Sequence, residues 1–283
     1  MSEAARLPTD LGAFDPRATY DAAAAAYEDA SRAWWGVAST RTVARLGLAP
    51  GDRVLDLACG TGGSALAAAA RVAPTGRVIG IDYSEGMLAI ARDKARAAGA
   101  DHLELRCADI ARTPVPEAPF DAVVCVLGLF FVDDMAGLLR SMWRMVAPGG
   151  TLAVTVLGRS FLAPVYEPWR AAVAAERPGL AIAPPWQRTD DPPTVEGLFA
   201  EAGIAGGDVR EESEPAPLAR PEDWWRIVMG SALRRWITEI GPAAAARVRD
   251  HNLGWIRANG VDEVEISVIY ARATRGPGAE DRS

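Results

Sequence analysis

The stretch that most limits how this chain can fold is residues 54–64, which read VLDLACGTGGS. Its apolar first half, bounded by glycines on both sides, is typical of a short parallel strand buried on both faces. Gly60 and Gly62 follow, and because neither carries a Cβ, the backbone can turn tightly and approach a ligand there. A helix is expected at 65–71, with the positive end of its dipole directed at whatever lies over the loop.

The acid at the end of this strand, Asp56, narrows the choice of ligand. Glycine spacing of this kind occurs in many nucleotide-binding proteins and is not specific by itself. In dinucleotide-binding loops the helix N-terminus meets a pyrophosphate, and a carboxylate beside it is unfavourable. Asp56 therefore favours a ligand that carries positive charge. The structural alternative is a tight strand-to-helix turn in which Asp56 only caps the helix.

A second acid follows the next expected strand. Residues 77–82 read RVIGID, so that Asp82 ends a buried strand beyond the glycine loop. An acid about twenty residues after such a loop is placed to accept two hydrogen bonds from the cis-diol of a ribose. The alternative role for Asp82 is to cap a helix expected at 84–98.

Further apolar runs continue the pattern toward the C-terminus. Strands are expected at 103–107, 120–127, 151–156, 209–213 and 265–270, and helices at 20–35, 40–46, 135–146, 194–202, 221–240 and 242–258. Strands that alternate with helices indicate an α/β fold with a mostly parallel sheet.

Composition excludes several classes of protein. The net charge of −7 does not provide the basic surface that holds nucleic-acid phosphates. No apolar run is long enough to span a bilayer, and residues 1–14 lack the apolar segment of a secretory signal. Cys59, Cys107 and Cys125 show no paired spacing and are expected to be buried thiols of a reducing cytosol. We therefore expect a cytoplasmic protein, and the scarcity of histidine predicts no metal site.

Together these motifs resemble a known family. Residues 54–62 are similar to the first motif of the class I S-adenosylmethionine-dependent methyltransferases, and the resemblance covers roughly residues 20–150. Within the family the chain most resembles the small-molecule branch that includes the ubiquinone and menaquinone C-methyltransferases. The resemblance implies a Rossmann-like doubly wound sheet of seven mostly parallel strands with an antiparallel last strand, an N-terminal helical arm and a helical lid.

The resemblance also implies S-adenosylmethionine as cofactor, with S-adenosylhomocysteine as product. The residues expected to contact it are Tyr27, Asp56, Ala58, Gly60, Thr61, Gly62, Asp82, Tyr83, Met87, Asp109, Ile110 and Leu127. In relatives the positions of Tyr83 and Met87 flank the adenine, Asp109 accepts from its amino group, and the chain after the fourth strand passes the methionine part. For Tyr27 the alternative is a helix residue that only packs on the core, whereas its aromatic face would attract a sulfonium.

The remainder of the chain predicts a lid. As one methyltransferase domain, the chain divides into an arm at 1–46, a cofactor-binding core at 47–158, a lid with outer elements at 159–262, the last strand at 263–274 and a disordered tail at 275–283. Of the 9 tryptophans only Trp143 lies in the core segment. The others form either a second hydrophobic core or the lining of an apolar pocket for a mid-sized substrate.

Few side chains are candidates for a catalytic base. His251 lies between Val248 and Trp255 on one predicted helix face, as a lid histidine or as the base. Glu28, Tyr166, Glu222 and Asp223 are weaker candidates.

The resulting hypothesis is methyl transfer from S-adenosylmethionine to an oxygen, nitrogen or carbon nucleophile of a small, largely apolar or aromatic metabolite. The resemblance and the composition indicate an acceptor from secondary metabolism. The partner is a small-molecule acceptor, not nucleic acid, and the protein is a monomer or homodimer. Three alternatives stay open: a cyclase or rearrangement catalyst that transfers no methyl group, an NAD(P)-dependent oxidoreductase, and a cofactor-binding subunit without activity of its own.

Overall fold

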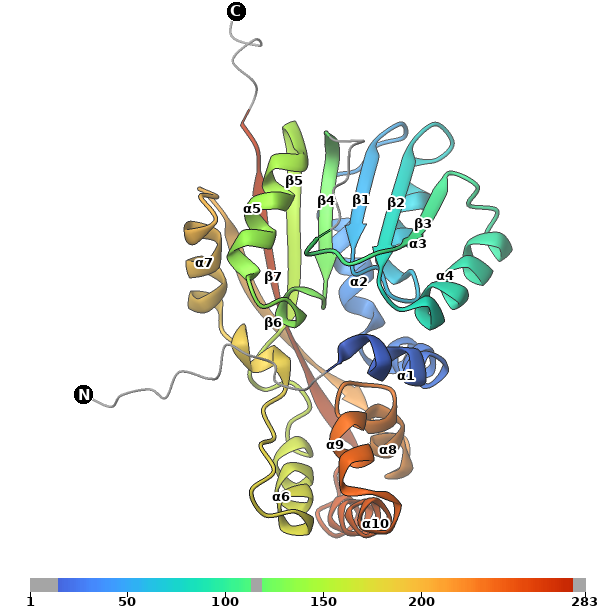
Figure 1. Cartoon of the computed structure of the whole chain (residues 1–283), viewed down its shortest axis with the longest axis vertical. Helices are drawn as coiled ribbons and strands as arrows, with labels where there is room; N and C mark the ends of the chain where they lie inside the picture. Colours follow the sequence, from blue (N-terminus) through green and yellow to red (C-terminus); the bar gives the residue numbers. More distant parts are fainter. Residues whose placement is uncertain (1–14, 113–118, 277–283) are drawn as a thin grey trace, which may run out of the picture.

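The computed structural model describes residues 15–112 and 119–276, which form a central sheet with helices on both faces and a helical layer beyond one end of the strands (Figure 1). The strands are β1 (Arg53–Leu57), β2 (Arg77–Asp82), β3 (Leu103–Cys107), β4 (Phe120–Val126), β5 (Val146–Leu157), β6 (Asp208–Pro217) and β7 (Glu263–Thr274). Their order is β3-β2-β1-β4-β5-β7-β6, and β7 runs antiparallel to both of its neighbours. The predicted doubly wound sheet with an antiparallel last strand is confirmed.

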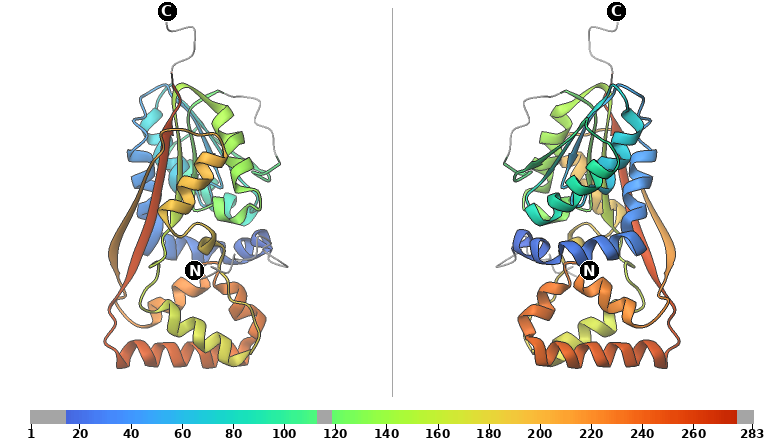
Figure 2. Two further views of the ribbon diagram at one scale, coloured as in Figure 1. Left: turned by 90° about the vertical axis from the view of Figure 1, so that its left-hand side faces the viewer. Right: turned by 90° about the vertical axis from the view of Figure 1, so that its right-hand side faces the viewer.

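The helices divide into those that cover the sheet and those beyond its end. The first group, with the arm, is α1 (Pro16–Ala30), η1 (Ser31–Trp35, a π-helix), α2 (Gly36–Ala44), α3 (Gly63–Val72), α4 (Glu85–Ala97), the 3₁₀ turn η2 (Leu129–Phe131), α5 (Met135–Met145) and α7 (Pro192–Glu201). The second group is α6 (Tyr166–Glu176), the 3₁₀ turn η3 (Pro185–Arg188), α8 (Glu222–Met229), α9 (Arg234–Ile240) and α10 (Pro242–Ala258). Figure 2 shows α1 between the two layers.

Alternation along the strands builds a core on each face of the sheet. Val54 of β1 belongs to an apolar cluster with residues of α3 and α4, while Leu55 and Leu57 belong to a larger cluster that continues into the lid. This follows from the opposite directions of successive side chains in a strand. The apolar core on one face of the sheet is therefore continuous with the core of the lid.

The lid also has an aromatic core of its own. Trp169, Trp224 and Trp236 are almost fully buried, and the ring of Trp169 lies 6.5 Å from that of Trp224 and 6.2 Å from that of Trp236. Edge-on pairs of this kind are favourable for aromatic rings. These three tryptophans follow the second-core alternative of the sequence analysis.

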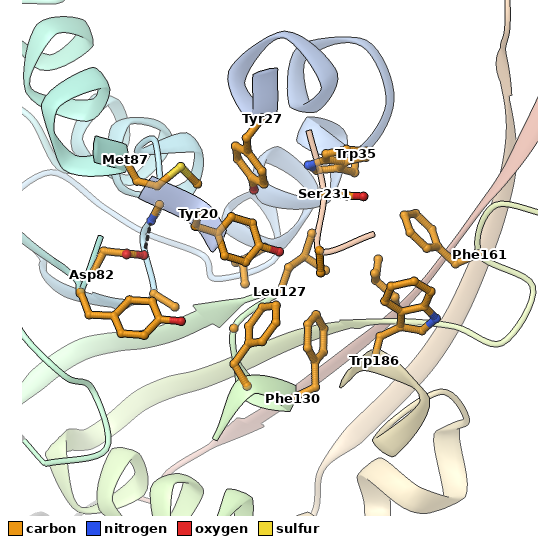
Figure 3. Close-up of a pocket in the computed structure, with 18 residues that line it drawn as sticks. Tyr20, Tyr27, Trp35, Asp82, Met87, Leu127, Phe130, Phe161, Trp186 and Ser231 are labelled. Carbon is orange, nitrogen blue, oxygen red and sulfur yellow. Dashed lines mark hydrogen bonds between the residues drawn. The ribbon is translucent and has the colours of Figure 1, made fainter. Parts of the chain in front are cut away.

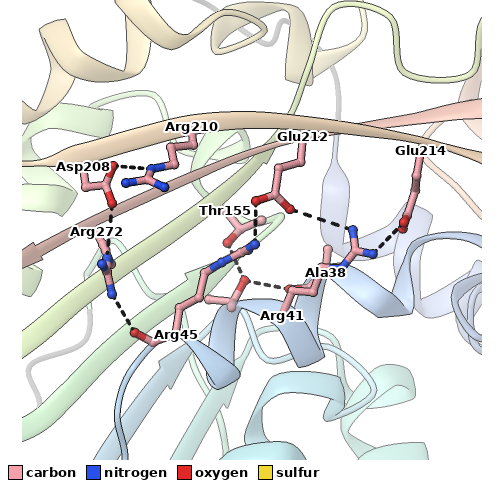
Figure 4. A network of polar contacts seen from close by, with 10 residues as sticks. Ala38, Arg41, Arg45, Thr155, Asp208, Arg210, Glu212, Glu214 and Arg272 are labelled. Atoms are coloured by element: carbon pink, nitrogen blue, oxygen red, sulfur yellow. Dashed lines mark hydrogen bonds and ion pairs between the residues drawn. The ribbon is translucent and has the colours of Figure 1, made fainter.

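Polar contacts fix α2, the second half of the arm, to the far edge of the sheet (Figure 4). Arg41 donates to Glu214 at 2.6 Å and Arg45 to Glu212 at 2.6 Å, so that both ion pairs join α2 to β6. The Thr42 hydroxyl lies 2.6 Å from that of Thr155 in β5. This end of the arm is therefore held by the sheet.

Several expectations differ from the structure. The single helix expected at 221–240 is two helices, because a Cβ at Gly230 would lie 2.5 Å from the carbonyl oxygen of Ala26 in α1 and the chain turns at this contact. Helix α6 was not predicted, since Pro168 lies inside its first turn, where proline is tolerated. The strand expected from 151 begins earlier, at Val146, with a register shift against β4.

Two further expectations need correction. Cys107 is exposed, whereas Cys59 and Cys125 are buried as expected. The predicted disordered tail begins too early, because Arg275 is held by backbone hydrogen bonds with Gly149 and Gly150. Residues from 277 on lie outside the described part of the chain, as do residues 1–14, which were expected to lie in the arm.

Candidate functional site

The glycine loop after β1 takes backbone conformations that L side chains rarely adopt. Gly60 and Gly62 have φ values of 54° and 83°, and Ala58 has a φ of 62°. A non-glycine residue in the left-handed region is uncommon and typically marks strain at a functional site. Gly62 precedes the first residue of α3, and its N–H donates to the Cys59 carbonyl at 2.8 Å.

Asp82 at the end of β2 joins the glycine loop to the turn before α4. Its Oδ2 accepts from the N–H of Gly60 at 2.9 Å, and its Oδ1 accepts from the N–H of Ser84 at 2.9 Å. Burial raises the pKa of Asp82, although both backbone hydrogen bonds act in the opposite direction. The carboxylate is thus held by two loops at once, and the ribose role of Asp82 stays a prediction. The capping alternative is wrong in detail, because the side chain that caps α4 is that of Ser84, which accepts from Met87 N–H.

Asp56 is fully buried behind the loop. Its Oδ2 accepts from the hydroxyl of Ser64 at 2.6 Å, whereas its Oδ1 is buried without a hydrogen-bond partner. Burial raises the pKa of Asp56 to about 7. A buried oxygen without a donor is costly, and it fits a ligand group or water that can donate a hydrogen bond.

Two adjoining hollows lie over these loops. The inner hollow is the one drawn in Figure 3. It is lined by Tyr20, Tyr27, Trp35, Ala58, Gly60, Asp82, Tyr83, Met87, Val126, Leu127, Gly128, Phe130, Phe131, Leu157, Phe161, Trp186, Ser231 and Ala232. The outer hollow includes Asp109, Ile110 and the start of α5, and it shares Ala58, Asp82, Tyr83, Gly128 and Phe131 with the inner one. The two hollows therefore adjoin along these shared residues.

The arm forms one wall of the inner hollow. The ring of Tyr20 lies 5.8 Å from that of Tyr27 and 5.5 Å from that of Phe131, and Tyr27 lies 5.8 Å from Trp35. The sequence predicts that Trp34 shares the face of Tyr20 and Tyr27, but Trp35 lines the hollow instead. The π-helix η1 explains the change, since its wider turn shifts the helix face by about one residue.

The lid forms the opposite end of the inner hollow. Figure 3 shows Asp82 and Met87 at one end and Phe161 and Trp186 at the other. The rings of Phe161 and Trp186 lie 5.8 Å apart in an edge-on arrangement. Ser231 comes from the turn between α8 and α9. Sequence reasoning missed Phe161, Trp186 and Ser231, and only the excess of tryptophans after β5 indicated that a lid lines a pocket.

Electrostatically the inner hollow is nearly uncharged. Asp82 is the one acidic or basic side chain among the described residues that line it. Burial raises the pKa of Tyr27 to about 12 and raises that of Tyr20 well above its usual value. Both phenols are therefore protonated near neutral pH, and the hollow suits an apolar or aromatic ligand with few hydrogen-bonding groups.

The other predicted contact residues fall into three groups. Tyr83, Met87 and Leu127 line the inner hollow, and Asp109 and Ile110 line the outer one. Asp56 at the end of β1, and Thr61 and Gly62 in the glycine loop itself, are buried and line neither hollow. The Oη of Tyr83 is buried without a partner, which provides a second unpaired polar atom at the site.

The proposed base His251 is wrong. It is exposed on α10, where the buried face is formed by Val248, Asn252 and Ile256, and it lines neither hollow. The sequence placed His251 on the buried face of α10 because Val248 and Trp255 lie three residues before it and four after it. Val248 is buried, but Trp255 is only half-buried, and His251 lies outside the buried face.

The weaker base candidates also lie outside the hollows. Glu28 is bound to Arg32 and Lys94, Asp223 to Arg220 and Arg226, and Glu222 to Arg257. Tyr166 packs its ring 5.6 Å from that of Trp186 without lining either hollow. Residues 15–112 and 119–276 contain no group of three or more His, Cys, Asp or Glu side chains arranged to hold a metal ion.

Comparison with known proteins now adds to this geometry. Residues 54–150 match the family model described as a methyltransferase domain. Residues 54–150 therefore resemble the methyltransferase family. The chain is 40% identical over 101 residues to the demethylmenaquinone methyltransferase of Bacillus cytotoxicus, a match that covers 36% of this chain and 43% of that protein. The predicted resemblance to menaquinone C-methyltransferases is confirmed for this segment, which spans less than half of the relative.

Two solved structures share the fold of the methyltransferase domain. Phosphoethanolamine N-methyltransferase 2 of Haemonchus contortus, in complex with phosphomonomethylethanolamine and S-adenosylhomocysteine, has a TM-score of 0.59 and 17% identity, covering 93% of this chain and 60% of that one. The [4+2]-cyclase SpnF has a TM-score of 0.56 and 21% identity, covering 93% and 95%. At these identities the likeness concerns the fold alone. No helix in the described part of this chain is long and apolar enough to cross a membrane.

Proposed function

We propose that this protein transfers a methyl group from S-adenosylmethionine to an oxygen, nitrogen or carbon atom of a small, apolar or aromatic metabolite. The observation that carries the proposal is the continuity of the site: Asp82 and Gly60 at one end of the inner hollow, and the aromatic lid at the other. A cofactor held at the first end presents its reactive group to an acceptor held at the second.

The residues present fit this cofactor. The Oη of Tyr83 is buried at the site without a hydrogen-bond partner, and Gly60 lines the hollow without a side chain. We assign Asp82 to the ribose hydroxyls, Asp109 and Ile110 to the adenine, and Tyr83 and Met87 to its flanks. Tyr27, Ala58 and Leu127 face the methionine part, while Asp56, through its hydrogen bond with Ser64, and the buried loop residues Thr61 and Gly62 hold the glycine loop in shape. When bound, S-adenosylmethionine supplies an activated methyl group that leaves a sulfonium.

The protein's own contribution is alignment and exclusion of water. In-line attack needs the acceptor atom about 3 Å from the methyl carbon and opposite the sulfur. The rings of Phe130, Phe161 and Trp186 confine a flat apolar acceptor, and the protonated Tyr20 offers a hydroxyl to hydrogen-bond it. Because no side chain that lines the inner hollow is a strong base, the acceptor must bring a nucleophile that ionises easily or needs no deprotonation.

Calorimetric titration tests the cofactor. The protein, freed of copurified ligand, is titrated with S-adenosylmethionine and S-adenosylhomocysteine, and with NADH and NADPH as controls for an oxidoreductase. We expect micromolar binding of the sulfur ligands only. Asp82→Ala should weaken it about 10- to 100-fold, because a charge-assisted acceptor is lost and two backbone N–H groups lose their partner. His251→Ala is the surface control and should bind like wild type. Binding of a nicotinamide, or of nothing, would contradict the proposal.

A second experiment separates methyl transfer from the alternative of a cyclase or rearrangement catalyst. Naphthols, hydroquinones and aromatic amines are incubated with S-adenosylmethionine, and both S-adenosylhomocysteine and methylated product are measured. Stoichiometric formation of the two supports methyl transfer. Conversion of an acceptor without S-adenosylhomocysteine would favour the alternative. The arrangement as one domain, the cytoplasmic location, a role in secondary metabolism and the monomeric or dimeric state stay predictions.

A further inference from the structure

Helix α1 presents two different sides to the site. Tyr20 and Tyr27 line the inner hollow, whereas the next residue after each, Asp21 and Glu28, faces the loops that follow β1 and β2. Residues seven apart in a helix lie on the same face. The arm therefore has an aromatic side toward the acceptor and a carboxylate side toward the cofactor loops.

Asp21 binds the loop that follows Asp82. Its Oδ1 accepts from the Ser84 hydroxyl at 2.6 Å and from the Gly86 N–H at 3.0 Å. The backbone comes just as close, since a Cβ at Gly86 would lie 3.2 Å from the Asp21 carbonyl oxygen. The hydrogen bond from Ser84 is the main cause that lowers the pKa of Asp21. Ser84 in turn donates its N–H to Asp82, so that Asp21 is one residue removed from the ribose carboxylate.

Glu28 binds the other cofactor loop. It is only 7% exposed and accepts from Lys94 in α4 at 3.1 Å and from Arg32 at 3.2 Å. Burial by itself raises the pKa of Glu28, but hydrogen bonds from Thr61 and Lys94 bring it below its usual value. Thr61 belongs to the glycine loop, between Gly60 and Gly62. The two carboxylates thus hold α1 to both loops that define the cofactor end.

The other half of the arm is anchored elsewhere. Arg41 and Arg45 fix α2 to β6, as Figure 4 shows, and the π-helix η1 lies between α2 and α1. Short π-helical segments are frequent at functional sites and interrupt the regular hydrogen-bond ladder of a helix. A movement of α1 about η1 would leave α2 in place, and it would have to break the contacts of Asp21 and Glu28.

We propose that Asp21 and Glu28 are positioning residues that hold α1 closed over the cofactor and thereby control the release of S-adenosylhomocysteine. The inference rests on the proposed function, because it assumes that the cofactor binds between the two loops. The same docking completes the aromatic wall of the acceptor site through Tyr20 and Tyr27. When α1 is closed, the acceptor wall is complete and the cofactor is enclosed. When α1 is open, the cofactor can exchange but the acceptor wall is incomplete, so that the two events exclude each other.

Stopped-flow measurement of S-adenosylhomocysteine binding tests this role. The variants are Asp21→Ala and Glu28→Gln, with Asp29→Asn as the matched control, since Asp29 is an exposed acid on the same helix. We expect the dissociation rate constant to rise about 5- to 20-fold in both variants and the association rate constant to stay within about twofold, since contacts made in the closed state act mainly on dissociation. Asp29→Asn should match wild type. Asp21→Asn, which keeps one acceptor oxygen, should recover part of the effect.

Hydrogen exchange separates this role from a general effect on stability. In the variants, faster exchange should be confined to residues 16–35, with β1 and β2 protected as in wild type. Exchange that rises throughout the sheet, or dissociation rates equal to those of wild type, would overturn the assignment of the two carboxylates while the cofactor proposal stands. A wild-type protein that does not bind S-adenosylhomocysteine would overturn both.

Discussion

The cofactor end and the lid end of the site are built by different means. Around the glycine loop the shape is set by the backbone: left-handed residues such as Ala58 and Gly60, and N–H groups directed at Asp82. In the lid the shape is set by side chains, with tryptophans packed edge-on and with Arg188, which donates to three carbonyl groups of the chain after β4. Where the backbone conformation forms the site, single substitutions are poorly tolerated. Where side chains form it, the lining residues can be substituted while the fold of the backbone is kept.

The largest effect is expected where backbone shape is tightest. Gly128→Ala would place a Cβ 2.4 Å from the Cβ of Ala58 and 3.0 Å from the sulfur of Cys125. Overpacking of this degree should lower the free energy of unfolding by about 3 kcal/mol and weaken S-adenosylhomocysteine binding about tenfold. Gly254→Ala in α10, where a Cβ meets open space, is the control and should be neutral or stabilising by up to about 1 kcal/mol. Chemical unfolding measures the free energy of unfolding, and calorimetry measures the affinity for S-adenosylhomocysteine. Equal changes in the two variants would contradict the contrast between the cofactor end and the lid.

The next effect concerns pH and Asp56. Because burial raises the pKa of Asp56 to about 7, the folded protein keeps this proton to near neutral pH, whereas the unfolded chain releases it near the ordinary value. Between roughly pH 4 and 7 the folded state binds more protons, so the contribution of Asp56 to stability falls as pH rises. Asp56→Asn lacks this titration. As pH rises from 5 to 8, its free energy of unfolding should therefore increase by about 2 kcal/mol relative to that of the wild type. Unfolding curves of both proteins that stay parallel across this range would contradict the assignment.

The smallest effect is expected in the lid. Arg188 donates to the carbonyl oxygens of Phe130 and Val132 from one nitrogen and to that of Asp133 from another, at 3.0 to 3.1 Å. Lysine cannot reproduce this fork, so Arg188→Lys should lower the free energy of unfolding by about 1 kcal/mol. The Kd for S-adenosylhomocysteine should stay within about twofold, because these contacts lie on the acceptor side. Arg159→Lys, in an exposed ion pair with Asp190, is the control and should change neither quantity. A tenfold loss of binding in Arg188→Lys would show that the two ends are not separable.

The contrast between the two regions also explains what the sequence could predict. At the cofactor end, the strand, the glycine loop and the acid after the next strand follow one another closely along the chain. Residues that are near in the sequence are therefore also near in space. The position of Asp82 beside the glycine loop was predictable for this reason, whereas the doubly wound sheet followed from the family resemblance. The sequence also indicated that Asp56 and Thr61 meet the ligand, but both are buried and line neither hollow.

In the lid, local pattern was a poor guide. Trp186 reaches the hollow from a 3₁₀ turn among prolines, and no periodicity marks such a turn. His251 was assigned to the wrong face because one half-buried neighbour, Trp255, was taken as part of the core stripe. The break between α8 and α9 depends on a contact of Gly230 with Ala26, which is more than two hundred residues away along the chain.

Because the tryptophans are unevenly distributed, intrinsic fluorescence can report on particular parts of this protein. Only Trp143 lies in the segment 47–158, while Trp35 and Trp186 stand in the wall of the inner hollow and three others form the core of the lid. Intrinsic fluorescence therefore comes almost entirely from the arm and the lid. A change of tryptophan emission on adding a ligand therefore reports a change in the environment of the arm or the lid, without any label. The glycine loop, which contains no tryptophan, does not contribute to this signal.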